Sequence, residues 1–271
     1  MNLDRSRRTE TSGSRRYASG VIDTHCHLGA DALTGDALTG LSAVVSVGTN
    51  LESCRRTLEL AEAHPHLWAV LGVHPNSADE ATLETREAIE SLCEHPKVVG
   101  VGETGFDTYW DEVAPQVQQD AFFWHAELAK RLQKPLVLHV RDKQGQEDAS
   151  LAAKDAVLQA GHRQGILHCC NGHEGLIEAG LELGWYVSFA GNLTYKSAKN
   201  LQAAAKLVPE ERLLVETDSP YLSPEPRRGR PNVPANVRYT AAFLAELRGV
   251  TLAGLEAVLD ANARRVYGLP D

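Results

Sequence analysis

The chain has 271 residues, 43% of them hydrophobic, which supplies a sizeable core and suits either one large α/β domain or two small ones. No run of residues approaches the roughly 20 consecutive apolar positions of a membrane-spanning helix, so we expect no membrane partner. The formal net charge is −9, which counts against a nonspecific duplex-DNA binder without excluding a nucleic-acid substrate, because bound divalent cations can reverse the local field.

Residues 1–20 are rich in Arg and Ser and have no apolar centre, so they are unlike a secretory signal. Five Arg against Asp4 and Glu10 give this segment a net charge of +3, and we expect a disordered basic tail. The cysteines have no Cys-x-x-Cys spacing and, without a signal sequence, are expected to be reduced thiols in a cytoplasmic protein. They are Cys26, Cys54, Cys93, Cys169 and Cys170.

After the tail, short segments rich in Val, Ile and Leu alternate with longer amphipathic segments, as in parallel sheets whose strands are buried on both faces. The predicted strands cover 21–25, 43–49, 67–73, 97–103, 135–140, 165–169, 185–191 and 212–217. The predicted helices cover 51–64, 81–95, 115–133, 196–208, 234–248 and 251–267. This alternation predicts that residues 21–271 form a single domain, a TIM-type (β/α)₈ barrel. The segment 28–40 is short and holds three glycines, so we expect the barrel to be open or distorted at this first crossover.

Polar side chains recur where the predicted strands end, which is where barrel enzymes place their active sites. Six such side chains stand at or just past the ends of five strands. They are His25, His27, Glu103, His139, His168 and Asp218. Imidazole and carboxylate groups gathered at one rim predict a metal site.

The spacing of the first two histidines supports this interpretation. Side chains alternate across a strand, so His25 and His27 point the same way and Cys26 points the opposite way. Alone, this pattern fits a pair of hydrogen-bonded core histidines equally well, but the four further groups favour a metal site. Six ligands exceed what one tetrahedral ion with an open position needs, and suit two divalent ions about 3.5–4 Å apart that share a carboxylate. Nitrogen and oxygen ligands without thiolate favour magnesium, manganese, zinc or cobalt.

The motifs around these residues resemble those of the TatD family of metal-dependent hydrolases, from Val21 to Gly268. They are VIDTHCHL (21–28), GVHP (72–75), VGETGFD (101–107), LHVRD (138–142), LHCCNG (167–172), GWYVSFAGNLTYK (184–196), VETDSPYL (215–222) and NVPANV (232–237). The resemblance implies a (β/α) barrel whose relatives include magnesium-dependent deoxyribonucleases, some of them 3′→5′ exonucleases.

The same resemblance implies how the ligands are shared between two ions. His25 and His27 correspond to ligands of the first ion, and His139 and His168 to ligands of the second. Glu103 corresponds to the carboxylate that bridges both ions.

Two further residues take catalytic roles by resemblance. Asp218 corresponds to the aspartate that ligates the first ion and orients or deprotonates the attacking water. His74, in GVHP, corresponds to a histidine that contacts the substrate or transfers a proton. The chain departs from the family pattern at Cys170 and Asn171, where an aromatic and a small residue are usual, and at Val233, where a glutamate is frequent. None of these positions is a predicted ligand, so the departures bear on substrate choice.

Four arginines at the predicted rim are candidate substrate-binding residues. Arg141 lies two residues past a predicted ligand on the same strand face, and Arg227, Arg228 and Arg230 lie in a Pro-rich loop after the last strand. They either contact phosphates or are solvent-exposed charges. The histidines on or beside predicted helices are expected to be ordinary surface or capping groups. These are His64, His66, His95, His125 and His162.

The leading interpretation is hydrolysis of phosphodiester bonds in single-stranded DNA from a free 3′ end, with two metal ions at the phosphate and Asp218 accepting the proton of water. The same centre could instead cleave an amide, ester or lactone in a small molecule, which the acidic composition favours slightly. A non-catalytic scaffold barrel is a third interpretation, and the complete set of six ligands argues against it. The sequence leaves the native metal and the oligomeric state open.

Overall fold

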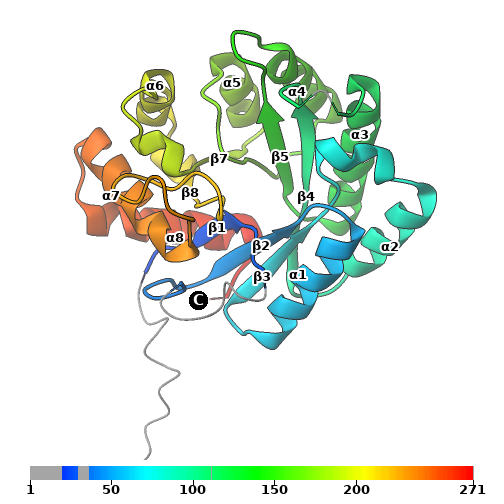
Figure 1. Ribbon diagram of the computed structural model, residues 1–271, viewed down its shortest axis with the longest axis horizontal. Coiled ribbons are helices and arrows are strands. Elements are labelled where there is room, and N and C mark those ends of the chain that lie inside the picture. The colour runs from blue at the N-terminus through cyan, green and yellow to red at the C-terminus, as the bar shows by residue number, and fades with distance from the viewer. Residues whose placement is uncertain (1–19, 30–36, 111, 271) are drawn as a thin grey trace, which may run out of the picture.

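The computed structural model describes residues 20–29, 37–110 and 112–270 (Figure 1). Eight parallel strands form one sheet in which each strand pairs with the next in chain order. They are β1 (Asp23–Cys26), β2 (Val44–Gly48), β3 (Leu67–Leu71), β4 (Val98–Asp107), β5 (Leu136–Arg141), β6 (Gly165–Leu167), β7 (Tyr186–Phe189) and β8 (Leu213–Val215). The predicted tail, residues 1–20, lies outside the described residues apart from Gly20 and stays a prediction.

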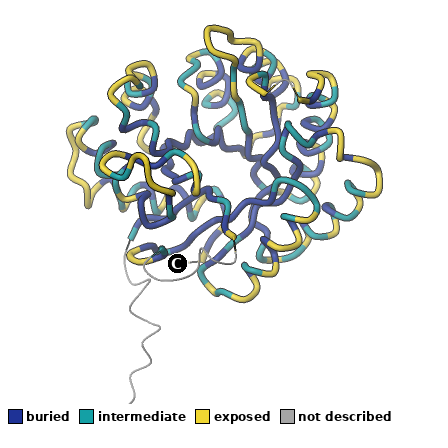
Figure 2. The backbone as a smooth tube through the Cα atoms, viewed as in Figure 1, coloured by how far each residue is buried: buried dark blue, intermediate teal, exposed yellow. Residues whose placement is uncertain are grey.

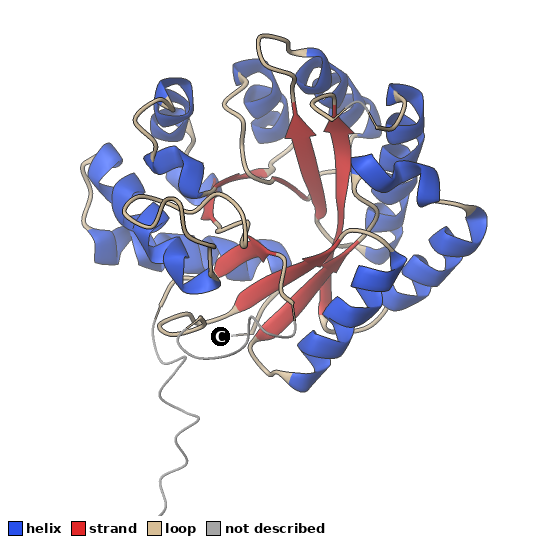
Figure 3. Ribbon diagram, viewed as in Figure 1, coloured by secondary structure: helices blue, strands red, loops and turns tan. Residues whose placement is uncertain are grey.

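Helices follow most of the strands and cover the outside of the sheet (Figure 3). They are α1 (Leu51–Ala63), α2 (Leu83–Cys93), α3 (Pro115–Leu132), α4 (Asp148–Ala160), α5 (Glu174–Glu182), α6 (Lys199–Leu207), α7 (Val237–Arg248) and α8 (Leu252–Tyr267), with short 3₁₀ helices η2 (Pro75–Glu80), η3 (Gly191–Thr194), η4 (Glu210–Arg212) and η5 (Pro234–Asn236). Among the described residues, no helix is long and apolar enough to cross a lipid bilayer.

The sheet curves until β8 meets β1, and hydrogen bonds join these two edges. The N–H of His27 donates to the carbonyl of Ser219 at 2.7 Å, and the N–H of Asp218 donates to the carbonyl of His25 at 2.9 Å. The predicted TIM-type (β/α)₈ barrel is therefore confirmed. The same bonds hold three predicted ligands side by side at the seam.

Two apolar clusters fill the molecule. The smaller takes side chains from every strand or from the residues beside it, and lies inside the barrel. Ala263 and Tyr267 of α8 belong to this cluster, and the Tyr267 hydroxyl donates to the carbonyl of Thr24 at 3.0 Å. The larger cluster lies between the strands and the surrounding helices. Figure 2 shows the strands as a buried ring, as the apolar composition of the predicted strands requires.

The distortion expected at the first crossover takes the form of irregular pairing. β1 and β2 pair in parallel, but the register shifts between Asp23, which faces Val44, and Cys26, which faces Ser46. Residues 37–40 of the crossover form a turn, and residues 30–36 lie outside the described part of the chain. The crossover thus distorts the pairing of β1 with β2 without separating the two strands.

α4 and α5 are not among the helices predicted from the sequence. α4 has the sequence DASLAAKDAVLQA, in which repeated Ala favours a helix but gives little contrast between its faces. α5 is only nine residues long and includes Gly175 and Gly180, whose low helix propensity weakens the helical pattern in the sequence. A Cβ atom on Gly180 would lie 3.1 Å from Leu167 Cδ1, so the glycine allows the helix to pack closely on β6.

β4 continues beyond its predicted end. The predicted strand ends at Glu103, whereas β4 runs to Asp107, so Glu103 lies within the strand. Gly102 and Gly105 have φ angles of 132° and 146°. A Cβ atom on Gly105 would lie 2.0 Å from the carbonyl oxygen of His139, so β5 approaches too closely for any other residue there. The register of β4 with β5 skips Glu103 at this irregularity.

Two of the histidines predicted to be surface or capping groups are buried. His125, on α3, is 0% exposed; its Nε2 accepts from the N–H of Val73 at 2.9 Å, and its Nδ1 donates to the carbonyl of Ala121 at 2.7 Å. His162 is 7% exposed, with Nε2 3.0 Å from the carbonyl of Lys134. A position on or beside a helix therefore does not predict that a histidine is exposed, because backbone groups can form hydrogen bonds with an imidazole that is buried between a helix and the barrel.

The burial of His125 predicts a loss of stability in mild acid. Burial lowers the pKa of His125 to about 3. The unfolded chain takes up this proton near pH 6.5 and the folded chain does not, so stability falls as the pH drops below that value. Between pH 7 and pH 5 the wild type should lose about 2 kcal/mol relative to His125→Gln, which has no titrating group there. Urea unfolding of both chains at the two pH values measures this change, and a constant difference between them would contradict it.

Candidate metal centre

Glu103 lies at the middle of the predicted cluster, and four imidazoles face its buried carboxylate. Its Oε2 lies 3.7 Å from Nε2 of His25 and 3.3 Å from Nε2 of His168. The same oxygen lies 3.4 Å from Nδ1 of His139. Its Oε1 lies 3.5 Å from Nε2 of His27. β1, β4, β5 and the segment after β6 therefore converge on one carboxylate.

Asp218 adds a second carboxylate from the segment after β8. Its Oδ1 lies 3.3 Å from Nε2 of His27. Its backbone is in the left-handed region, with φ 53°, and its N–H is held by the carbonyl of His25. The structure thus brings all six predicted ligands together at the carboxyl-terminal rim of the barrel.

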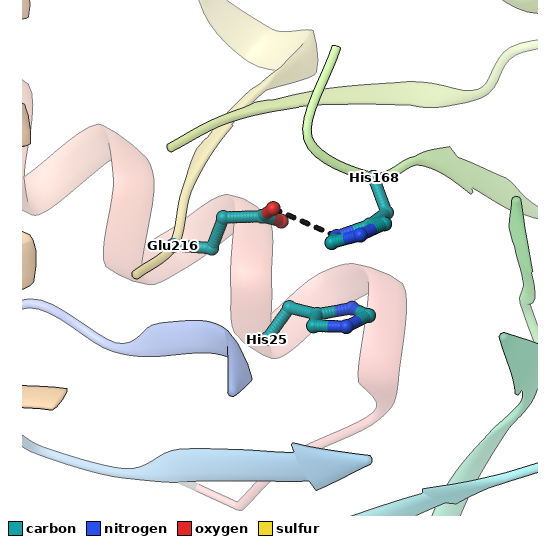
Figure 4. Close-up of side chains that lie close together, drawn as sticks. All are labelled: His25, His168 and Glu216. Carbon is teal, nitrogen blue, oxygen red and sulfur yellow. Dashed lines mark ion pairs between the residues drawn. The ribbon is translucent and has the colours of Figure 1, made fainter. Parts of the chain in front are cut away.

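Two of the imidazoles contact a second carboxylate through the ring nitrogen that does not face Glu103. Nε2 of His139 lies 3.3 Å from Oδ2 of Asp107. Nδ1 of His168 lies 2.7 Å from Oε1 of Glu216, as Figure 4 shows. A carboxylate on the far nitrogen of a metal-binding histidine fixes its tautomer and orients its ring. Each of these two rings therefore directs its other nitrogen at Glu103.

The sequence analysis did not single out Asp107 or Glu216. Asp107 also accepts from the N–H of Tyr109 at 2.9 Å, and Glu216 from the N–H of Cys169 at 2.9 Å, so both carboxylates are fixed in place. Both lie in motifs that carry a predicted ligand, VGETGFD and VETDSP. Their position close in sequence to a predicted ligand could have identified them, because a metal-bound histidine usually has a carboxylate as hydrogen-bond partner.

The surroundings of His25 test whether a metal ion fits. His25 is 1% exposed, and neither of its ring nitrogens has a hydrogen-bond partner. Its ring stacks on that of His168 with centroids 3.5 Å apart. Two ligands that each lie about 2.1 Å from a tetrahedral ion are about 3.4 Å apart. The four imidazole nitrogens lie 3.3 to 3.7 Å from the Glu103 carboxylate, so the residues fit divalent metal ions.

The charges of the cluster also favour a cation. Burial alone would raise the pKa of Glu103, but His25 and the other imidazoles hold it well below its usual value. Burial alone would lower the pKa of His27 and His139, but the carboxylates beside them raise both values to about 9. The metal-free cluster therefore holds protons beside ionised carboxylates, and metal binding must displace them because histidine ligates as the neutral ring.

His74 borders this cluster from the start of η2. Its ring centroid lies 4.4 Å from that of His139, and its Nδ1 accepts from the N–H of Asn76 at 3.1 Å. Burial, with the neighbouring His139, lowers the pKa of His74 to about 4. A neutral ring that accepts at Nδ1 carries its proton on Nε2. His74 is thus a hydrogen-bond donor beside the cluster.

Arg141 ends β5, two residues beyond His139, and is exposed. Its guanidinium carbon lies 3.8 Å from the ring centroid of Tyr109 and 5.6 Å from that of Trp110. The side chain therefore lies over aromatic rings at the rim.

The arginine loop after β8 shows a similar pairing. Arg228 lies over the ring of Tyr195 at 4.2 Å, and Arg227 donates to the hydroxyl of Tyr239 at 3.1 Å. Arg228 and Arg230 are exposed. A phosphate contact from any of these arginines stays a prediction.

Comparison with known proteins identifies the family of this chain. Residues 22–268 match the sequence model of the family described as TatD related DNase. A metal-dependent hydrolase named TatD from Mycobacterium tuberculosis is 39% identical over 92% of this chain and 98% of its own length. The chain belongs to the TatD family. The family is one of metal-dependent hydrolases, so this TatD protein is an enzyme of that class.

Two further relatives extend the comparison. The TatD protein of Citrobacter rodentium, named as a 3'-5' ssDNA/RNA exonuclease, is 34% identical over 85% of this chain and 88% of its own length. The crystal structure of the TatD homologue YjjV from Escherichia coli superposes with a TM-score of 0.81 and 29% identity, covering 92% of this chain and 98% of that chain. The barrel described above is therefore the fold of this family.

The positions that depart from the TatD pattern make contacts of their own. Cys170 is 4% exposed and packs in the larger apolar cluster. Asn171 donates to Oγ of Ser150 at 2.7 Å and to Oδ2 of Asp142 at 3.2 Å, which ties the segment after β6 to the start of α4. Val233 precedes η5. The first two positions thus support the segment that carries His168.

The contact between Glu216 and His168 predicts how this TatD centre holds its metal. Glu216→Gln keeps the shape of the side chain but removes the charge that orients the ring. We expect the affinity for the metal ion that His168 would ligate to fall about 10–100-fold, the usual cost of losing such a partner. Calorimetric titration of the metal-free protein with Mn²⁺ measures this loss. The matched control is Glu178→Gln, an exposed position on α5. Equal affinities in Glu216→Gln and the control would show that the contact does not tune the metal.

Proposed function

We propose that this TatD protein hydrolyses phosphodiester bonds of single-stranded DNA from a free 3′ end. In this proposal one divalent ion is held by His25, His27, Glu103 and Asp218, and a second by Glu103, His139 and His168. Magnesium, manganese, zinc and cobalt all suit these nitrogen and oxygen ligands. Two such ions supply Lewis-acid stabilisation of the attacking and leaving oxygens in an in-line displacement at phosphorus. The observation that supports the proposal most is the single carboxylate of Glu103 facing four imidazole nitrogens.

The protein residues manage the proton of the attacking water and the position of the phosphate. Water attacks phosphorus, and its proton passes to Asp218. The bond from phosphorus to the 3′ oxygen of the preceding nucleotide breaks, and this leaving oxygen takes up a proton from solvent. The carboxylate of Asp218 is 14% exposed, so it is accessible to water at the rim. The N–H at Nε2 of His74 donates to a phosphate oxygen. This assigns His74 to substrate contact, because its Nδ1 already accepts from Asn76.

The net charge of −9 is compatible with this substrate when metal ions are bound. Two divalent ions add four positive charges where the phosphate lies, and Arg141 stands at the same rim. Outside this centre the net negative charge of the chain repels the polyanion, so contacts are few and binding is weak and only moderately salt-dependent. The free cysteines suit a reducing, cytoplasmic setting.

Degradation of end-labelled single strands tests the proposed function. The Mn²⁺-loaded protein should shorten a 5′-labelled strand stepwise when its 3′ end is free, and leave it intact when that end is blocked. A panel of small amides and lactones, the alternative substrates, is assayed with the same preparation. If the strand stays intact with magnesium, manganese, cobalt and zinc while an amide or lactone is cleaved, the proposed function is wrong.

A further inference from the structure

Exposed aromatic side chains are concentrated at one end of this barrel. Among the described residues, the exposed large hydrophobic side chains include three aromatic ones, Tyr109, Trp110 and Tyr221, at 43%, 53% and 62% exposure. All three lie in the segments that follow β4 and β8, beside the candidate metal centre. The exposed aliphatic ones lie on helices or directly beside them. They are Leu83, Leu151, Leu158, Leu207, Val250 and Leu252.

Tyr109 and Trp110 form a small surface, which we call the rim aromatic pair. Their ring centroids lie 5.0 Å apart at 82°, so the rings meet edge to face. Arg141 lies over the Tyr109 ring at 3.8 Å. The guanidinium also lies 5.6 Å from the centroid of the Trp110 ring, which is still 53% exposed to solvent. The surface thus combines an open aromatic face with a positive charge.

This pair is rigidly connected to the metal centre. The N–H groups of Tyr109 and Trp110 donate to Oδ1 of Asp107 at 2.9 and 3.3 Å. The other oxygen of Asp107 lies 3.3 Å from Nε2 of His139. One carboxylate therefore fixes both a predicted metal ligand and the backbone of the rim aromatic pair.

On the other side of the cluster, Tyr221 lies beside His27, with ring centroids 6.2 Å apart. Its N–H donates to the carbonyl of Asp218 at 2.9 Å, so it too is connected to the cluster. Aromatic surface therefore flanks the candidate centre on both sides.

We propose that the rim aromatic pair stacks an unpaired base of the substrate, while Arg141 contacts the adjoining phosphate. This rests on the proposed function and names how the strand is recognised. Every base has a π-face, so stacking on Tyr109 and Trp110 is tolerant of sequence but requires a base that is not paired. The recognised substrate class is single-stranded nucleic acid, with a duplex excluded unless its end is opened.

The test compares two oligomers with the same phosphodiester backbone. One is oligothymidylate, and the other carries a stable abasic analogue in place of every nucleoside. Stacking of one base changes affinity about 5- to 150-fold. The Mn²⁺-loaded wild type should therefore favour oligothymidylate by about that factor in kcat/KM. In the Tyr109→Leu/Trp110→Leu double variant this ratio should fall towards one.

Controls separate stacking from folding and from catalysis. The double variant must show the wild-type thermal midpoint and bind the same number of Mn²⁺ ions. Leu207→Ala removes an exposed apolar group on α6, far along the chain from the rim, and should keep the wild-type ratio. If the double variant keeps that ratio as well, the stacking proposal is wrong and the proposed function stands. If the wild type degrades neither oligomer, the proposed function itself is wrong and the stacking proposal falls with it.

Discussion

Replacing Asp218 with Asn is expected to lower kcat on single-stranded DNA by about 10²- to 10⁴-fold, the usual effect of removing a general base. The amide has the size of the carboxylate and keeps an oxygen that can ligate a metal ion, but it cannot accept the proton of water. Asp218 has a left-handed backbone, its N–H donates to the His25 carbonyl, and its Oδ1 lies 3.3 Å from Nε2 of His27. KM should change much less than kcat, because the substrate contacts remain.

The result must be separated from simple loss of metal. The Asp218→Asn protein is therefore assayed at saturating Mn²⁺, with bound metal determined on the same sample. A fully loaded variant that retained near-normal kcat would show that another group accepts the proton. Asp260→Asn, a partly exposed position on α8 that pairs with Arg264, is the matched control and should keep wild-type kcat.

Replacing Glu103 with Gln is expected to abolish the binding of at least one of two ions and to reduce turnover below detection. An amide oxygen carries no charge and cannot neutralise two cations, whereas the carboxylate of Glu103 faces the ligands of both proposed sites. The Gln side chain would also stand among imidazoles without the charge that they surround.

Metal analysis by mass spectrometry after gel filtration measures this loss, with Glu211→Gln on the exposed surface as the matched control. Circular dichroism shows whether the variant is folded. A folded Glu103→Gln protein that still bound two ions with wild-type affinity would mean that Glu103 does not bridge them.

The fold and the ligand cluster were predictable from sequence because both follow from local periodicity. Alternating side chains put His25 and His27 on one strand face, and parallel strands bring their carboxyl ends to one rim. The position of Glu103 within β4 was not predictable in this way. It depends on the close approach of β5 to Gly102 and Gly105, a contact between strands that single-strand patterns do not contain.

The carboxylates that contact His139 and His168 were harder to predict, because these contacts also join separate segments of the chain. Glu216 and His168 are 48 residues apart in the sequence, yet Oε1 of Glu216 lies 2.7 Å from Nδ1 of His168. Asp107 and His139 meet only because β4 and β5 are neighbours. The contacts of Arg141 and Arg228 with aromatic rings were not predictable either, because they depend on loop conformations that composition does not specify.

The most direct measurement of the central claim is the rate of single-strand degradation as a function of metal added to the metal-free protein. Mn²⁺ is titrated into a known concentration of the chain, well above the dissociation constants, and the rate is recorded at each step. The proposed dinuclear centre around Glu103 predicts that the rate rises until about two equivalents are bound and is then constant. A rate that reaches its maximum at one equivalent would contradict the account.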